Sequence, residues 1–131
     1  MLNVTLKDLV PTLPQLRVLH YLISVSEGKH VAHCLDLDLV AIGNDVQAVS
    51  RKLDGLVKAH IEFSLATGQL SNLATKAPMV YWKLFFVGTT IDLEPKTIHI
   101  TIPETVQVVP LDSSESEIGI LARQQLAHAA A

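Results

Sequence analysis

Residues 30–45, HVAHCLDLDLVAIGND, place histidine, cysteine and aspartate side chains close together. These residue types bind metal ions, act as nucleophiles or transfer protons, so the segment is the first candidate for a chemical site. Imidazole and thiolate groups suit zinc, whereas paired carboxylates suit a harder divalent cation. Which of these chemistries is open to the chain depends on how the surrounding element orients the side chains.

The two histidines and the cysteine do not converge if this segment is a strand. Alternate residues of a strand share a face, so His30 and Cys34 point one way and His33 points the other. A zinc site normally needs three or four converging protein ligands. No short metal-ligand spacing joins the remaining histidines, which are His20, His60, His99 and His128. We therefore predict no metal site here and interpret the histidines as strand residues of the surface or the core.

Cys34 and the two aspartates also allow a structural interpretation. As a nucleophile, Cys34 would need a neighbouring base and a setting that stabilises the thiolate, so a small buried thiol is favoured. Asp36 and Asp38 could bind a divalent ion in a small metal-dependent hydrolase or nuclease, which is the alternative function. Aspartates two residues apart between short strands more often cap a turn or face solvent. The sequence therefore assigns no catalytic, cofactor-binding or metal-binding residue.

Composition narrows the class of protein. A chain of 131 residues with 49% hydrophobic residues fits one compact domain. No apolar run reaches the roughly 18 to 20 residues that span a bilayer, and the first residues lack the pattern of a secretory leader. Cys34 is the only cysteine, which excludes an internal disulfide and suits a reducing cytoplasm. The net charge of −3 gives little attraction to phosphate backbones, so we expect no DNA partner, and the lack of a long apolar run predicts no membrane partner.

Strand patterns surround the candidate segment. Residues 16–26 are rich in branched and aromatic side chains, and the following Glu27-Gly28 suits the tight turn of a hairpin. Residues 29–35 would form the second strand. Residues 39–42 would form a third short strand that ends at Gly43. The expected arrangement is three consecutive antiparallel strands.

A helical period of about three and a half residues follows the third strand. Asn44 is the expected N-cap, with Gln47 three residues later, and Gly68 suits the position just past the end. This is the chain's clearest helix. The apolar stripe expected to pack on the sheet comprises Val46, Val49, Leu53, Leu56, His60 and Phe63.

The apolar run at residues 77–88, APMVYWKLFFVG, follows a polar stretch at 69–76 that we predict to be a loop. Pro78 fits the first turn of a helix and Gly88 its end, which favours a short helix, while a buried strand remains the alternative. Its aromatic residues, Trp82 among them, either fill the core, which is favoured, or form an exposed patch that contacts another chain.

Two further elements are expected near the carboxyl end. Residues 96–103 alternate isoleucine with polar residues and predict a strand that residues 106–109 would extend. In the tail at 111–131, Ser114 to Glu117 is similar to a capping box and predicts a terminal helix with a weak apolar face.

Residues Arg17 to Phe63 resemble the HicB-like antitoxin family in the order of their elements. The similar segments are a strand, a Glu-Gly turn, HVAHCLDLDLVAIG and the helix NDVQAVSRKLDGLVKAHIEF. The residues at Cys34 to Leu37 and at Gly43 stand where the family has cysteine or proline, leucine, aspartate, leucine and glycine. The chain departs from the family at VQAV, which replaces an acidic helix start, and at LDLDL, which replaces a Leu-Pro-Gly turn.

The resemblance implies an α+β fold: a three-stranded antiparallel meander plus a later strand, with the long helix packed on one face. The domain would span residues 1–110. In the family this module sequesters a small RNA-cleaving toxin, and a separate carboxyl-terminal segment binds DNA; we expect that segment to be missing here. The expected function is therefore that of a non-enzymatic, cytoplasmic binding module. Its partner would be a small toxin-like protein or a second copy in a homodimer.

Overall fold

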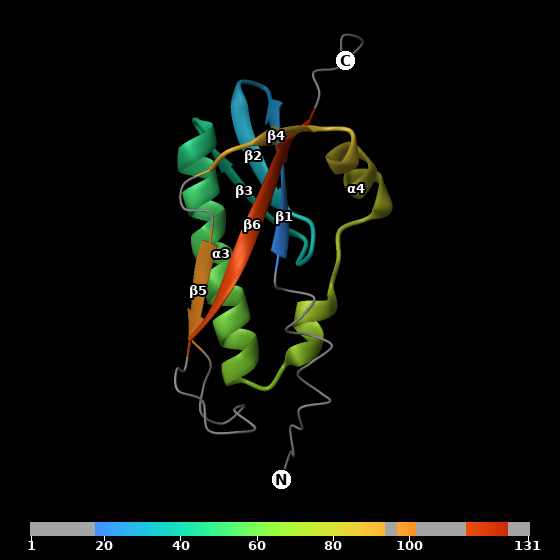
Figure 1. Cartoon of the computed structure of the whole chain (residues 1–131). Helices are drawn as coiled ribbons and strands as arrows, with labels where there is room; N and C mark the ends of the chain where they lie inside the picture. The colour runs from blue at the N-terminus through green and yellow to red at the C-terminus, as the bar shows by residue number, and fades with distance from the viewer. Residues whose placement is uncertain (1–17, 94–96, 102–114, 126–131) are drawn as a thin grey trace.

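The computed structural model describes residues 18–93, 97–101 and 115–125, which form an α+β fold. A mixed sheet of six strands lies between a long helix on one side and a short helix on the other (Figure 1). None of the helices in these ranges has the length and apolar character that a membrane crossing requires. The elements are β1 (Val18–Ser26), β2 (Lys29–Cys34), β3 (Leu39–Gly43), α3 (Val46–Ala66), η1 (Leu70–Ala74), α4 (Met79–Phe86), β4 (Thr89–Ile91), β5 (Thr97–Thr101) and β6 (Glu115–Gln124).

The first three strands form the predicted antiparallel meander. β1 and β2 are joined by a tight turn in which Glu27 and Gly28 have φ angles of 51° and 80°. Positive φ angles at both central residues give the turn the twist that two hairpin strands need. β3 then pairs antiparallel with β2, with Cys34 opposite Leu39. The hairpin and the third strand are thus confirmed.

The segment after residue 110 contains a strand where a terminal helix was predicted. β6 pairs in parallel with β1, and both β4 and β5 pair antiparallel with β6 on its other side. Ile118 and Ala122 of β6 are buried in the core because alternate residues of the strand face α3. The terminal helix prediction is therefore wrong. The later strand predicted at 96–103 is confirmed as β5, and its suggested extension at 106–109 lies outside the described residues.

The residues at both ends of α3 explain where this helix begins and ends. Asp45, rather than the predicted Asn44, is the N-cap, and its side-chain Oδ1 accepts a hydrogen bond of 2.8 Å from the Ala48 N–H. A carboxylate at this position satisfies a free backbone N–H of the first turn. After the C-cap Thr67, Gly68 takes a φ of 71°, the left-handed conformation that commonly follows a helix.

The buried face of α3 differs in part from the predicted stripe. Val49 and Leu53 are buried as expected, but Leu56 and Phe63 are 44% and 61% exposed. The second half of the predicted stripe is therefore wrong. The buried apolar residues of α3 follow one another at steps of four and are Val49, Leu53, Val57, Ile61 and Leu65.

The short helix α4 is confirmed, and it packs on the sheet face opposite α3. Its Phe85 is buried together with Leu22 of β1 and with Leu35 in the β2–β3 turn. Phe86 is 64% exposed, so the adjacent phenylalanines have different roles. The preceding stretch, predicted as a loop, contains the short helical turn η1.

Two glycine substitutions are expected to act in opposite directions. A Cβ at Gly88, which links α4 to β4, would lie 2.6 Å from the Gln124 carbonyl oxygen of β6. Gly88→Ala should therefore lower the unfolding free energy by about 1 to 3 kcal/mol.

A Cβ at Gly55 in α3 would meet no neighbour, so Gly55→Ala should raise the unfolding free energy by about 0.5 to 1 kcal/mol. Urea unfolding measures both, and equal effects would contradict the close approach of Gly88 to β6.

Candidate functional site

Two histidine-aspartate pairs lie on the sheet face opposite α3. His20 Nδ1 is 3.0 Å from Asp36 Oδ2, and the His20 backbone N–H donates to Asp36 Oδ1 at 2.6 Å. His33 Nε2 is 2.7 Å from Asp38 Oδ1. Leu22 is the register partner of His33 and lies two residues after His20, so both imidazoles share this face. The turn between β2 and β3 thus supplies both carboxylates, and strands β1 and β2 supply the two imidazoles.

Helix α4 packs against both imidazoles through aromatic rings. The His20 ring centroid lies 5.2 Å from that of Trp82 and 5.3 Å from that of Phe85. The His33 ring meets Tyr81 edge to face at 4.8 Å. Such tilted and edge-to-face arrangements are the favoured geometries of ring pairs. The histidine-aspartate pairs therefore lie at the contact between the sheet and α4.

The structure places the predicted strand residues on the expected faces. Cys34 is fully buried on the α3 side, whereas His33 lies opposite with its side chain against Tyr81. Burial raises the pKa of the Cys34 thiol to about 12, so the thiolate is a negligible fraction at neutral pH. A nucleophilic role for Cys34 has no support in this geometry, and the buried thiol interpretation is confirmed.

Asp36 and Asp38 serve different histidines. Asp36 is buried, and its carboxylate accepts from the backbone and contacts the ring of His20. Asp38 is half-exposed in the turn, with a positive φ of 54° that aspartate tolerates better than most residues. Across the described ranges, no three histidine, cysteine, aspartate or glutamate side chains gather closely enough to hold a metal ion. Each of the two carboxylates is instead paired with its own histidine.

A part-buried polar contact that the sequence did not reveal joins β1 to α3. The Tyr21 hydroxyl donates a hydrogen bond of 2.8 Å to Asp54 Oδ1 across the core. Burial raises the pKa of the Asp54 carboxyl, and burial together with the nearby Asp54 charge raises the pKa of the Tyr21 phenol. The phenol consequently remains protonated and serves as a donor that fixes α3 on the sheet.

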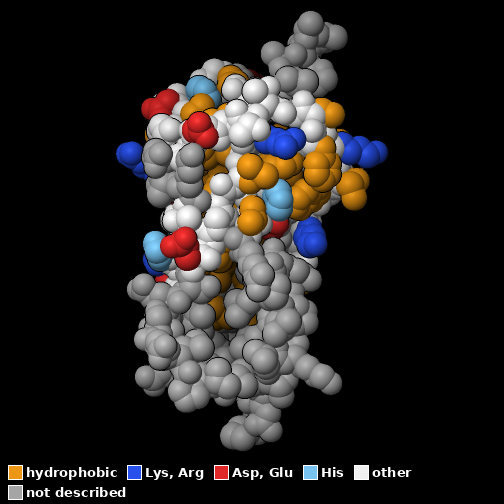
Figure 2. Space-filling view, viewed as in Figure 1, with side chains coloured by type: hydrophobic (Ala, Val, Ile, Leu, Met, Phe, Trp, Pro, Cys, Tyr) orange, Lys and Arg blue, Asp and Glu red, His pale blue; other side chains and the backbone are white. Residues whose placement is uncertain are grey.

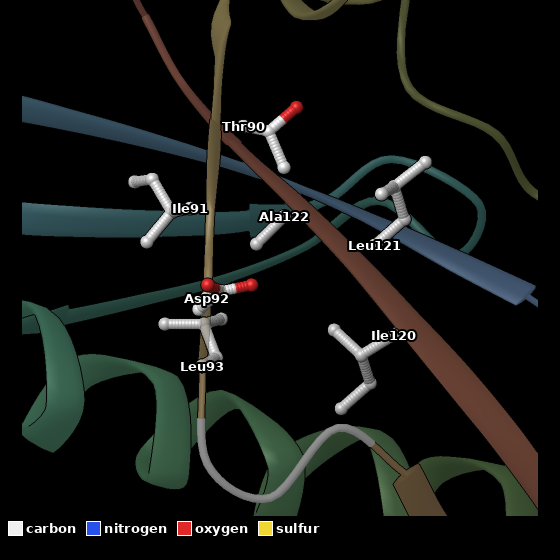
Figure 3. A pocket seen from close by; sticks show the side chains of 7 residues that line it. All are labelled: Thr90, Ile91, Asp92, Leu93, Ile120, Leu121 and Ala122. Carbon is white, nitrogen blue, oxygen red and sulfur yellow. The ribbon is translucent and has the colours of Figure 1, made fainter.

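A small hollow lies where the chain leaves β4 (Figure 3). β4 pairs with the end of β6 and β5 with its beginning, so the middle of β6 faces this hollow. Its volume is about 140 Å³, room for a few water molecules and less than a typical ligand pocket. It is lined by Thr90, Ile91, Asp92, Leu93, Ile120, Leu121 and Ala122.

The outward side of α4 carries a larger apolar surface. Four side chains there, which we call the α4 surface, are between 58% and 65% exposed: Met79, Val80, Phe86 and Val87. Figure 2 shows hydrophobic side chains gathered over α4, with lysine and arginine side chains at their margin. A shallow hollow of about 360 Å³ lies beside Met79, Trp82 and Phe86, and Lys76 is its charged lining residue.

Strand β3 forms one edge of the sheet. Its Val40 and Ile42 are 48% and 53% exposed and lie on the face opposite α3, because their register partners are His33 and Val31. The core-facing Ala41 is buried. An exposed edge with apolar side chains can pair with a strand from another chain.

Comparison with known proteins gives no match to any family model, curated protein or solved structure. The assignment of a function therefore depends on the surfaces and contacts described above.

The sequence interpretation missed the pairing of His20 with Asp36. These residues are sixteen positions apart, and the signal that could have found them is the register of the hairpin, which brings Leu35 beside His20. The exposed aromatic patch around Trp82 was considered but was not favoured. The structure divides that group, with Phe85 buried and Phe86 exposed.

Proposed function

We propose that the protein is a non-enzymatic, HicB-like binding module that acts by self-association, with edge strand β3 as the interface of a homodimer. The observation that carries the proposal is the half-exposed pair Val40 and Ile42 on β3, which among the described strands pairs only with β2. Covering apolar side chains and pairing free backbone groups both favour the addition of a strand.

The geometry of β3 suits a symmetric pair. Two β3 strands that run antiparallel would bring the same residues together across a two-fold axis, as an isologous dimer requires. Lys52 Nζ donates to the Ile42 carbonyl oxygen at 3.2 Å in an exposed contact. The backbone N–H of an added strand can replace this ammonium group as the donor.

The resemblance to the HicB-like family adds support from the order of elements. The meander followed by a long helix is the module that binds a small toxin in that family, and the β3 edge would accept a toxin-like protein by the same strand addition. The net charge of −3 disfavours DNA as a partner. The single buried thiol of Cys34 suits a reducing compartment such as the cytoplasm.

The double variant Val40→Lys with Ile42→Lys should convert a dimer into a monomer. Lysine on an edge strand opposes pairing because two like charges would meet across the two-fold axis. Static light scattering over a range of concentrations measures the mass of the wild type and the variant. Both substituted side chains are half-exposed, so circular dichroism should show an unchanged fold.

Val25→Lys is the matched control. Val25 is 55% exposed but lies at the hairpin end of β1, away from the β3 edge. This variant should remain dimeric. A wild-type protein that is monomeric at every concentration, or a dimer that survives the double substitution, would contradict the β3 interface. A gel-shift assay on the same samples tests the expectation that DNA is not bound.

A further inference from the structure

The outward side of α4 is apolar where a helix of a globular protein is normally polar. Phe85 faces the sheet, while Met79, Val80 and Phe86 face away from it, and all three are more than half exposed. Lys83 is the only charged residue of this helix. Helices that are apolar all round are normally covered on all sides. The α4 surface therefore has the character of an interface.

Three basic side chains of the described residues adjoin the α4 surface. Lys76 and Lys83 are exposed beside it, and the Arg123 Nη1 donates to the Phe86 carbonyl oxygen at 3.1 Å. The carboxylates of the nearby β2–β3 turn, Asp36 and Asp38, are each in contact with a histidine. A partner of complementary charge must therefore be acidic.

The shape of the surface indicates what the partner inserts. The hollow of about 360 Å³ between Met79, Trp82 and Phe86 can receive one or two apolar side chains. Lys76 is also one of its lining residues. Buried apolar anchors with charges around them are the usual anatomy of a protein interface. A bilayer surface would need an apolar projection but no hollow.

We propose that the α4 surface binds an acidic amphipathic segment of another protein, whose apolar side chain enters the hollow beside Trp82 and whose carboxylates meet Lys76 and Lys83. The β3 edge of the proposed homodimer uses other residues, so this inference does not rest on it. The partner proposed for the α4 surface carries negative charge, which is the opposite of the charge of a basic partner.

Binding can be measured by the fluorescence of Trp82, because it is the only tryptophan of the chain and lines the hollow. The probe is a short helical peptide with leucine and phenylalanine on one face and glutamate elsewhere. Titration should shift the Trp82 emission to shorter wavelength as the ring loses contact with water. The same peptide with lysine in place of glutamate, and vesicles of mixed neutral and anionic phospholipid, complete the set of probes.

Two variants test the residues. Phe86→Ser should abolish the emission shift because it removes one wall of the hollow, and Lys76→Glu with Lys83→Glu should weaken binding of the acidic peptide by about tenfold or more. Val25→Ser and Lys29→Glu are the matched controls, since both residues are exposed at the hairpin, and they should bind as the wild type does.

The inference fails if the acidic and basic peptides bind equally well, if only the vesicles shift the emission, or if no probe does so. The vesicle result would assign the surface to a membrane instead. Light scattering of the same samples measures the β3 dimer separately, so failure of one proposal is distinguishable from failure of the other.

Discussion

The Leu53→Asp variant is expected to be unfolded or nearly so in the absence of denaturant. Leu53 is fully buried in the middle of the contact between α3 and the sheet. Loss of a buried leucine side chain costs about 2 to 5 kcal/mol, and a buried unpaired carboxyl adds several more. The sum is comparable with the whole stability of a small domain, about 5 to 15 kcal/mol. Circular dichroism at neutral pH measures the loss of structure.

Leu56→Asp is the control because Leu56 belongs to the same predicted stripe but is 44% exposed. This substitution should lower the unfolding free energy by less than about 1 kcal/mol, mainly through the lower helix propensity of aspartate. Equal damage from both variants would show that the buried face of α3 is assigned wrongly.

Phe85→Ala is expected to lower the unfolding free energy by about 3 to 5 kcal/mol, the range for a buried aromatic residue. Phe85 is 1% exposed, contacts the His20 ring and lies beneath the Arg123 guanidinium, whose centre is 5.2 Å from the ring centroid. Its removal leaves a cavity in the contact that holds α4 on the sheet. Urea unfolding followed by circular dichroism gives the change.

Phe86→Ala changes the neighbouring residue of the same type and should alter the unfolding free energy by less than about 1 kcal/mol. Its side chain is 64% exposed, so truncation leaves no internal cavity. If Phe86→Ala were the more damaging substitution, α4 would pack on the sheet through a different face.

Local signals in the sequence predicted the first half of the fold well. The Glu27-Gly28 turn fixes the hairpin through its positive φ angles, and strand alternation then fixes the faces of His33 and Cys34. The resemblance implied the fold class, with a long helix on a sheet, and these elements together with the helical period after Gly43 agree with it. Each of these signals depends on residues only a few positions apart.

The stripe on α3 was predicted on the wrong period. Alternating steps of three and four give an average of three and a half residues, which suits a supercoiled pair of helices. α3 instead packs on a sheet and keeps steps of four, so Leu56 and Phe63 rotate out of the contact. Buried serines conceal the true pattern. Ser50 and Ser64 donate to the carbonyl oxygens of Val46 and His60, which satisfies their hydroxyls inside the structure.

Strand β6 was mistaken for a helix because both of its faces are covered. Ile118 and Ala122 face α3, while Leu121 packs with the cluster under α4, so the strand lacks the polar alternation of a half-buried strand. Its partner β1 is remote in the sequence. No local sequence pattern indicates that two strands so far apart in the chain will pair.

The candidate interaction surfaces were equally hard to predict, for a related reason. The apolar composition of residues 77–88 indicated burial. The sequence could not show that the side of the helix with Phe85 is buried and the side with Phe86 is exposed. That division depends on where α4 meets His20 and His33 on the sheet.

The parallel pairing of β1 with β6 has a consequence for the order of folding during synthesis. Val18 lies opposite Gly119, so the hairpin of β1 and β2 leaves the ribosome long before the strand that completes the sheet beside it. Contacts between distant parts of a chain slow folding, and unpaired strand edges promote aggregation meanwhile. Until β6 has been synthesised, the edge of β1 that later pairs with it lacks this partner, and a chaperone can bind there.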